Sequence, residues 1–494
     1  MIVTTGSNKS YIMSNKVFRF PEKGIDADAM LSELRAHRKG DASWRDGRMF
    51  GYIYHAGSRE VKAIEQAYHL FWNENALNPS LFSSLRRLEN ETVAMVADLL
   101  HAGDDYAGNL TTGGSESIIM AVKAGRDWAR KHRPGIREPE MNAPVTTHPA
   151  FSKAADFTGV RVLYAPLAAD KRVDVAEMEK LITANTVLLT ASAPCFPYGV
   201  IDPVEEIAEV ALKHNLLFHV DSCLGGLFLP FIEKLGYKVP QFDFRVKGVT
   251  SISADMHKYG YSAKGASVIL YSSHELRKSQ YFVMSNWPGG LYASPTMLGT
   301  RSGAPIAAAW AALKTIGSDG YLRMAEKVMA TTEKLREGIE SIPGFRVLGK
   351  PDMSVFSFTS DRHDIYRIGD ELAKKGWNLD KLQFPSALHM TVSNMNASHE
   401  SEFLQALREA VALTEGKNIS EASSHVLISI VRALSKWLPE KWFRLLSSRF
   451  TAMLNGKGGG GATGAAAYGM TLAIDNRSNV DEIMLDVLDK LYSV

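Results

Sequence analysis

The sequence predicts an α/β fold, in which a large domain with a mostly parallel central sheet is followed by a smaller α+β C-terminal domain. Three observations support this prediction. A chain of 494 residues, 45% of them hydrophobic, is too long for a single ordinary core. Short apolar runs alternate with helical patterns from about residue 76 to residue 271. After Gly317 the sequence contains long helical stretches, which are followed by strand-like runs.

The large domain contains three apolar runs that we interpret as strands, at 186–192, 215–222 and 267–271. Their lengths, and the helical patterns between them, are typical of parallel strands joined by crossover helices. The segment 203–215 begins with Pro203 and two glutamates and continues with apolar residues at helical spacing. It is therefore predicted to be one of these crossover helices.

Three parts are expected along the chain. These are an N-terminal segment (1–75), the large domain (76–341) and the C-terminal domain (342–494). Two strand-like runs, 345–349 and 354–360, begin the C-terminal domain.

A basic, aromatic-rich stretch occupies 426–454 and is followed by the glycine-rich run 456–461. We expect either peripheral lipid contact through 426–454 or a solvated helix that packs on the C-terminal domain. The glycine run is interpreted as a flexible joint, because it lacks the strand-to-helix context of a phosphate loop. The basic residues of the stretch outnumber its single acid, Glu440, and are Arg432, Lys436, Lys441, Arg444 and Arg449.

The composition argues against several classes of protein. A formal net charge of +2 is small for this length, so no nucleic-acid partner is expected. Only two cysteines occur, Cys195 and Cys223, and they form no Cys-x-x-Cys motif, so no metal centre is expected. The first twenty residues lack the apolar core of a signal peptide, and no run of about 18 apolar residues follows. We therefore expect a soluble, cytoplasmic protein.

Lys258, in the run SISADMHKYGYSAKGASVILY (251–271), gives the strongest chemical signal. A lysine becomes a nucleophile when it is partly desolvated, and a loop between two apolar strands provides such a place. The alternative is a solvated loop lysine. Asp221 supports the first interpretation, because ligands of open α/β sheets collect beyond the carboxyl ends of the strands. A carboxylate there can pair with a pyridinium nitrogen, or it can simply cap a helix.

A glycine-rich helix start, TTGGSES (111–117), is a candidate phosphate site. Gly114 and Ser115 would hold the phosphate, since glycines let backbone amides approach an anion and the helix N-terminus adds unpaired N–H groups. A simple turn with a helix cap is the alternative.

Three further side chains are candidates for the same site. His148 would stack on a planar ring, His257 would donate to a phosphate, and Lys264 would neutralise a second phosphate. The simpler alternatives are that His148 is a structural histidine, that His257 donates to a carbonyl, and that Lys264 is a surface charge.

Asp221, the His257–Lys258 pair and the glycine-rich helix start occur in the order and spacing of fold-type-I pyridoxal-phosphate enzymes. The sequence closely resembles the sphingosine-1-phosphate lyase family, densely from about Gly47 to Ile316 and thinly in the C-terminal domain. The runs that resemble this family are 47–55, 78–91, 111–125, 221–231, 242–271, 289–303 and 465–470.

The resemblance implies a homodimer with pyridoxal 5'-phosphate in each active site, at the subunit interface, with segment 1–75 contributing to that interface. Lys258 would form the Schiff base, Asp221 would meet the pyridine nitrogen, and His148 would stack on the ring. The residues expected at the cofactor phosphate are Gly114, Ser115 and His257.

The implied reaction is retro-aldol cleavage of the C2–C3 bond of a phosphorylated sphingoid base, which gives a long-chain aldehyde and phosphoethanolamine. Tyr54 and Thr300 resemble residues that the second subunit contributes, and Lys264 resembles a lysine at the catalytic or phosphate end of the site. Lys258, Lys264 and Tyr54 are the candidates for the base that takes the C3 hydroxyl proton.

Two other functions remain open at this point. A group II decarboxylase acting on glutamate or an aromatic amino acid shares the lysine, the aspartate and the stacking histidine, but it needs a cation for the α-carboxylate. A non-catalytic scaffold on a decayed fold predicts the loss of Lys258, Asp221 or His148, and all of them are present.

The sequence departs from the family pattern at the substrate end. Asn78 replaces a histidine, Ala263 replaces a proline before Lys264, and the run 299–303 differs at Thr300 and Ser302. These changes concern substrate phosphate affinity and C3 chemistry rather than cofactor binding.

Overall fold

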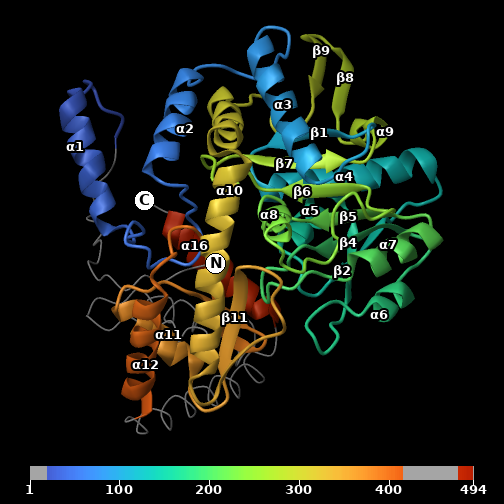
Figure 1. Cartoon of the computed structure of the whole chain (residues 1–494). Helices are drawn as coiled ribbons and strands as arrows, with labels where there is room; N and C mark the ends of the chain where they lie inside the picture. The colour runs from blue at the N-terminus through green and yellow to red at the C-terminus, as the bar shows by residue number, and fades with distance from the viewer. Residues whose placement is uncertain (1–18, 416–476, 493–494) are drawn as a thin grey trace.

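A large domain lies beside a smaller one in the computed structural model, which describes residues 19–415 and 477–492, and the long helix α10 runs along both domains (Figure 1). The large domain contains a seven-stranded sheet of order β1-β7-β6-β5-β4-β2-β3, so the predicted α/β fold is confirmed. Its strands are β1 (Ala107–Thr111), β2 (Glu140–Pro144), β3 (Arg161–Ala165), β4 (Thr186–Ser192), β5 (Leu217–Asp221), β6 (Ser251–Ala254) and β7 (Ser267–Tyr271).

The direction of β7 differs from the prediction. The run 267–271 is predicted as a parallel strand, but β7 is antiparallel to both β6 and β1. Residues 255–266 join β6 to β7 without a crossover helix, so the chain turns back directly and β7 runs antiparallel to β6. The other pairs of this sheet are parallel. The connection that reverses the chain contains Lys258.

Helices cover both faces of the sheet. Leu188 of β4 packs in an apolar cluster with α4 and α5, whereas its neighbour Leu189 belongs to the cluster that contains α7 and α8. Successive side chains of a strand point to opposite faces, so the sheet is buried on both sides. The predicted crossover helix is confirmed as α7, with Pro203 at its N-cap. The helices of this domain are α3 (Ser83–Leu99), α4 (Gly114–His132), α5 (Ala150–Thr158), α6 (Val175–Lys180), α7 (Val204–Lys213), α8 (Leu229–Lys234) and α9 (His274–Lys278).

The C-terminal domain contains a four-stranded antiparallel sheet of order β10-β11-β13-β12. It follows α10 (Gly303–Glu340), which starts well before the helical pattern predicted after Gly317 and is interrupted at that glycine, where φ is 61°. The sheet is accompanied by α11 (Ile365–Lys374) and α12 (Glu400–Glu415). Its strands are β10 (Phe345–Val347), β11 (Val355–Ser360), β12 (Asp380–Gln383) and β13 (Ser386–Thr391). The stretches 426–454 and 456–461 lie outside the described residues.

Residues just before α2 (Ser58–Leu70) attach to the C-terminal domain. The Phe50 N–H donates to the Asn378 carbonyl at 3.1 Å, and the Asn378 N–H donates to the Arg48 carbonyl at 2.9 Å. The Phe50 ring is buried against Trp377, with ring centroids 5.9 Å apart. Because α2 itself packs along α10, the residues between Phe50 and α2 are held between the two domains.

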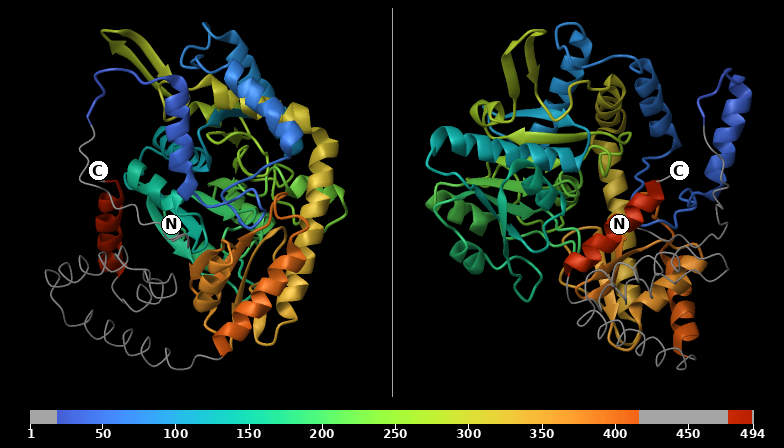
Figure 2. Two further views of the ribbon diagram at one scale, coloured as in Figure 1. Left: turned by 90° about the vertical axis from the view of Figure 1, so that its left-hand side faces the viewer. Right: turned by 180° about the vertical axis from the view of Figure 1, so that it is seen from behind.

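Two elements project from the body of the molecule in Figure 1 and in the right-hand view of Figure 2. Helix α1 (Ala27–His37) has no buried residue, and β8 (Phe282–Trp287) is exposed along its whole length in a hairpin with β9 (Gly290–Ser294). The remaining elements are the short 3-10 helix η1 (Arg38–Gly40) and α16 (Arg477–Tyr492). None of the helices in the described ranges combines the length and apolar character needed to cross a membrane.

Candidate active site

A cavity of about 430 Å³ lies at the carboxyl ends of β4, β5 and β6. The N-terminus of α4 forms another part of its wall, and residues of the N-terminal segment and of the C-terminal domain complete it. The sequence-predicted residues in its lining are Tyr54, Gly114, Ser115, His148, Asp221, His257, Lys258 and Lys264. Folding therefore brings together all the predicted site residues except Thr300.

Lys258 lies in the β6–β7 connection, with its Nζ 2.9 Å from Oδ2 of Asp255. The other oxygen of Asp255, Oδ1, is buried and has no hydrogen-bond partner. Burial alone would lower the pKa of Lys258, but the carboxylates of Asp255 and Asp221 outweigh it, so the pKa is raised. With 26% of its side chain exposed, the amine is accessible from the cavity. The amine must lose a proton before it can attack a carbonyl carbon, and the adjacent Asp255 carboxylate can accept that proton.

Asp221 is the last residue of β5, as expected for a ligand-binding acid at a strand end. Its Oδ1 accepts hydrogen bonds from the Cys223 N–H at 3.0 Å and from the Ser253 hydroxyl at 3.2 Å. These two donors fix the orientation of the carboxylate at the edge of the sheet. The carboxylate therefore lies where it can meet a ring nitrogen in the cavity.

The helix start is built for close approach to an anion. Helix α4 begins at Gly114 and no side chain caps it, so its first N–H groups lack intrahelical acceptors. A Cβ on Gly114 would lie 2.8 Å from Cys223 Sγ and 2.9 Å from both Asp255 oxygens, so only glycine fits there. Ser115 follows at the exposed side of the helix start. The residues present therefore fit pyridoxal phosphate, which Lys258, Asp221 and the start of α4 would hold.

The two histidines flank this arrangement. His148 follows β2. Its Nδ1 accepts a hydrogen bond from the Ala150 N–H at 3.1 Å, and Nε2, on the other side of the ring, takes no part in that contact. Burial and the nearby Lys258 cation lower the pKa of His148, so the ring is neutral and suited to stacking. His257 Nδ1 accepts from the Ala266 N–H at 3.2 Å, and burial likewise lowers its pKa.

Tyr54 and Lys264 lie together in the lining of the cavity. The Lys264 Nζ is 5.1 Å from the centroid of the Tyr54 ring and donates to the His257 carbonyl at 3.0 Å. Burial and the Lys258 cation lower the pKa of Lys264 to about 8. Burial, assisted by the charges of Asp255 and Asp380, raises the pKa of the Tyr54 phenol, so it stays protonated. The resemblance implies that Tyr54 comes from a second subunit, whereas the structure brings Tyr54 into the cavity of its own chain.

Thr300 lies outside this cavity. Its side chain is exposed, and its hydroxyl accepts a hydrogen bond from the Asn75 amide at 3.4 Å. The neighbouring Arg301 carbonyl accepts from the Ala76 N–H at 2.8 Å, so the segment is pinned to residues 74–76. Thr300 therefore does not line the cavity that contains Lys258.

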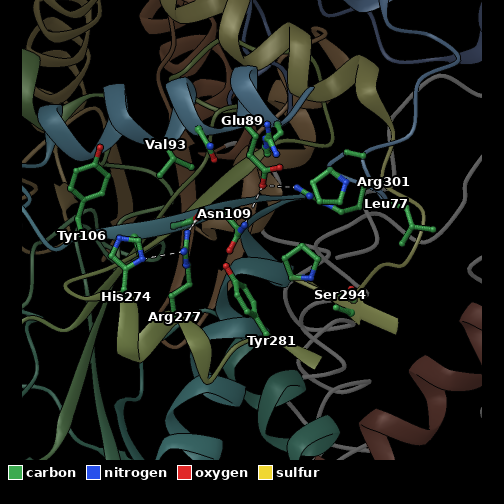
Figure 3. Close-up of a pocket in the computed structure, with 18 of the residues that line it drawn as sticks. Leu77, Glu89, Val93, Tyr106, Asn109, His274, Arg277, Tyr281, Ser294 and Arg301 are labelled. Atoms are coloured by element: carbon green, nitrogen blue, oxygen red, sulfur yellow. Dashed lines mark hydrogen bonds and ion pairs between the residues drawn. The ribbon is translucent and has the colours of Figure 1, made fainter. Parts of the chain in front are cut away.

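A larger cavity of about 650 Å³ lies beside β1 (Figure 3). Its centre is a buried ion pair, in which Arg301 Nη2 donates to Glu89 Oε1 at 2.6 Å and to the Leu110 carbonyl at 3.1 Å. None of the residues that line the smaller cavity also lines this larger one. The larger of the two cavities is thus not the one that contains the predicted chemistry.

Sequence analysis does not single out Asp255, Tyr52 or Asp380, which all line the smaller cavity. Asp255 directly follows β6, and this strand-end position is the same signal that identifies Asp221. The Tyr52 hydroxyl donates to Asp380 Oδ1 at 2.5 Å across 328 residues of sequence. No local pattern predicts a pair that only folding assembles.

The chain matches the Aminotransferase class-V family over residues 58–381. It is 43% identical to a sphingosine-1-phosphate lyase from Dictyostelium discoideum over 403 residues, which cover 81% of this chain and 75% of the relative. The structure of a Burkholderia pseudomallei sphingosine-1-phosphate lyase superposes with a TM-score of 0.78 at 40% identity, covering 86% of this chain and 98% of that one.

A Lactobacillus brevis glutamate decarboxylase has a TM-score of 0.72 at 19% identity, covering 82% of this chain and 97% of that chain. Similarity at this level of identity shows that the two proteins share a fold, and no more.

Proposed function

This chain belongs to the sphingosine-1-phosphate lyase family, and we propose that it cleaves the C2–C3 bond of phosphorylated sphingoid bases. It is a pyridoxal-phosphate-dependent lyase, with a long-chain aldehyde and phosphoethanolamine as the proposed products. The observation that supports the proposal most directly is the cavity, in which Lys258 lies with Asp221 and the start of α4.

The residues of the cavity suit this reaction. When bound, pyridoxal phosphate supplies an electron sink for the bond that breaks. Lys258 would provide the amine that attaches the cofactor, and Asp221 would keep the ring nitrogen protonated. Among the groups that can take the C3 hydroxyl proton, Lys264 is favoured, because its pKa of about 8 makes the neutral amine available. Tyr54 keeps its proton and acts as a hydrogen-bond donor.

The decarboxylase alternative fits the cavity less well. A decarboxylase has to hold the α-carboxylate of an amino acid, a task for which arginine is well suited. No arginine lines this cavity in the described part of the chain.

We also propose that the enzyme acts as a homodimer. The projecting elements expose large apolar side chains, among them Val283 at 68% and Leu291 at 86%. Apolar groups gathered on projecting elements mark a protein interface, and closed two-fold dimers are the commonest solution. Thr300 follows the same hairpin and is exposed, so a second subunit can bring it to a neighbouring cavity.

The test is product analysis with the purified holoenzyme. Incubation with a phosphorylated sphingoid base is expected to release phosphoethanolamine and a long-chain aldehyde in equal amounts. Incubation with glutamate or an aromatic amino acid is expected to release no carbon dioxide. The reverse result would show the protein to be a decarboxylase. Analytical ultracentrifugation of the same sample tests the dimer.

A further inference from the structure

Asp380 is a buried carboxylate on the wall that the C-terminal domain contributes to the cavity. It is the first residue of β12, it is 5% exposed, and it lines the same cavity as Lys258 and Tyr54. The other three acids of the cavity have evident tasks. Asp255 pairs with Lys258, Asp221 lies where the ring nitrogen is expected, and Glu116 accepts hydrogen bonds from the Thr112 and Met297 N–H groups at 2.6 and 2.9 Å. Asp380 has no such task in the chemistry derived above.

Asp380 is held in place, and no lysine or arginine side chain in the described part of the chain pairs with it. The Tyr52 hydroxyl donates to Oδ1 at 2.5 Å, and His389 Nδ1 is 3.9 Å from Oδ2. His389 donates from Nε2 to the Phe196 carbonyl at 2.7 Å, so its Nδ1 presents a lone pair rather than a proton to Asp380. Burial lowers the pKa of His389 to about 4, so the ring is uncharged near neutral pH. No lysine or arginine within residues 19–415 and 477–492 forms an ion pair with Asp380.

The backbone that presents Tyr52 is itself strained. Tyr52 has a φ of 60°, a left-handed conformation that a bulky residue rarely adopts. Strain of this kind persists where the surrounding structure fixes it, often at a functional site. The Tyr52 conformation is fixed by two contacts. The Phe50 N–H donates to the Asn378 carbonyl, and the Tyr52 hydroxyl donates to Asp380.

A buried carboxylate that no described lysine or arginine pairs with, such as Asp380, attracts or repels the groups that a substrate brings near it. A second carboxylate is repelled strongly in a buried cavity, whereas a hydroxyl group can donate a hydrogen bond to Asp380. An amino acid carries its carboxylate directly on the carbon that bears the amine, so the charge stays deep in the cavity. A phosphorylated sphingoid base carries its phosphate further from that carbon.

We propose that Asp380, oriented by Tyr52, is a specificity-determining residue that rejects amines bearing an adjacent carboxylate and accepts those bearing hydroxyl groups. The inference deepens the proposed function and rests on it for the identity of the natural substrate. It also explains, from this chain's own residues, how a cavity on a fold shared with decarboxylases discriminates against amino acids.

Burial raises the pKa of Asp380 to about 6, and the hydrogen bond from Tyr52 opposes this rise. At about pH 8 the group is therefore ionised, and discrimination is best measured there.

The experiment uses two small probes that differ only at the group in question, L-serine and serinol, in which a hydroxymethyl group replaces the carboxylate. Their binding to the holoenzyme is titrated by the change in the visible absorbance of the cofactor at about pH 8. The wild-type protein is expected to bind serinol more tightly than L-serine. Asp380→Asn, which keeps the shape and removes the charge, is expected to improve the affinity for L-serine relative to serinol about tenfold.

Two controls separate charge from disturbance of the fold. Tyr52→Phe removes the hydrogen bond but keeps the carboxylate, so it is expected to retain the preference for serinol. Asp361→Asn removes a surface acid that pairs with Arg346 and is expected to behave as wild type. An unchanged ratio in Asp380→Asn would overturn the inference. If instead the ratio shifts while the wild type releases no aldehyde from a phosphorylated sphingoid base, the proposed function fails and the role of Asp380 stands.

Discussion

Two cavities of this molecule each contain a buried acid beside a cation, and they differ in how completely the oxygens of the acid are hydrogen-bonded. In the larger cavity, Glu89 Oε1 accepts from Arg301 at 2.6 Å and from the Asn109 amide at 3.4 Å (Figure 3). It also accepts from the Leu110 N–H at 3.0 Å. In the smaller cavity, Asp255 Oδ1 has no partner.

The cations differ in the same way. The Arg301 side chain is 9% exposed, whereas the Lys258 side chain is 26% exposed and accessible from its cavity. Fully bonded buried charges specify a structure, and partly bonded ones are ready to meet a ligand. The comparison teaches that an acid with a free oxygen beside an accessible amine, rather than cavity volume, marks the cavity that contains the predicted chemistry.

Replacing Lys258, the accessible cation of the smaller cavity, is expected to have the largest effect on activity. Lys258→Ala removes the amine that attaches the cofactor, so lyase activity should fall by about 10⁴-fold or more. The visible absorbance band that borohydride abolishes should also be missing. Lys278→Ala, which removes an exposed lysine of α9, is the matched control and should keep both. Retention of the band in Lys258→Ala would show that another amine holds the cofactor.

Replacing Arg301, the buried cation of the larger cavity, is expected to lower the stability of the fold instead. Arg301→Ala leaves Glu89 buried without its counter-charge, which costs about 3–5 kcal/mol of unfolding free energy. Thermal or denaturant unfolding measures this loss, and any protein that remains folded should still show the cofactor band. Arg323→Ala, which breaks an exposed pair with Asp319, should cost no more than about 1 kcal/mol. Equal effects of the two variants would contradict the distinction between the cavities.

The acid at the end of β5 is expected to matter for chemistry but not for attachment. Asp221→Asn keeps the hydrogen-bond geometry and removes the charge that holds the ring nitrogen protonated, so kcat should fall about 10²–10³-fold. The absorbance band should persist, because Lys258 is intact. A variant with full activity would place the ring nitrogen elsewhere.

The parts of this site that could be predicted from the sequence are those with a local pattern. Lys258 lies between two apolar runs, Asp221 ends a strand, and Gly114 starts a helix, so each position has a signal within a few residues. Asp255 has the same strand-end signal as Asp221 and was open to the same inference. The direction of β7 could also have been predicted, because residues 255–266 are too few to contain a crossover helix.

The remaining features depend on distant residues that meet only in the folded chain. Arg301 and Glu89 are 212 residues apart, and Tyr52 and Asp380 are 328 residues apart. Charged and aromatic residues at such positions have no periodicity or spacing that distinguishes them from surface groups. Their burial, and hence their energetic importance, is a property of the tertiary structure.

The smallest expected effect concerns Lys264 and appears as a change in pH dependence. Burial and the Lys258 cation lower its pKa from 10.5 to about 8, so the neutral amine predominates above that pH. If Lys264 takes the C3 hydroxyl proton, kcat/KM should rise with pH, about tenfold per unit, and level off above about pH 8. Lys264→Arg stays charged over this range and should lose the rise, whereas Lys278→Arg should keep it. If Lys264 instead binds the substrate phosphate as a cation, the wild-type profile falls above about pH 8 and Lys264→Arg restores it, because the guanidinium keeps the charge that the lysine loses.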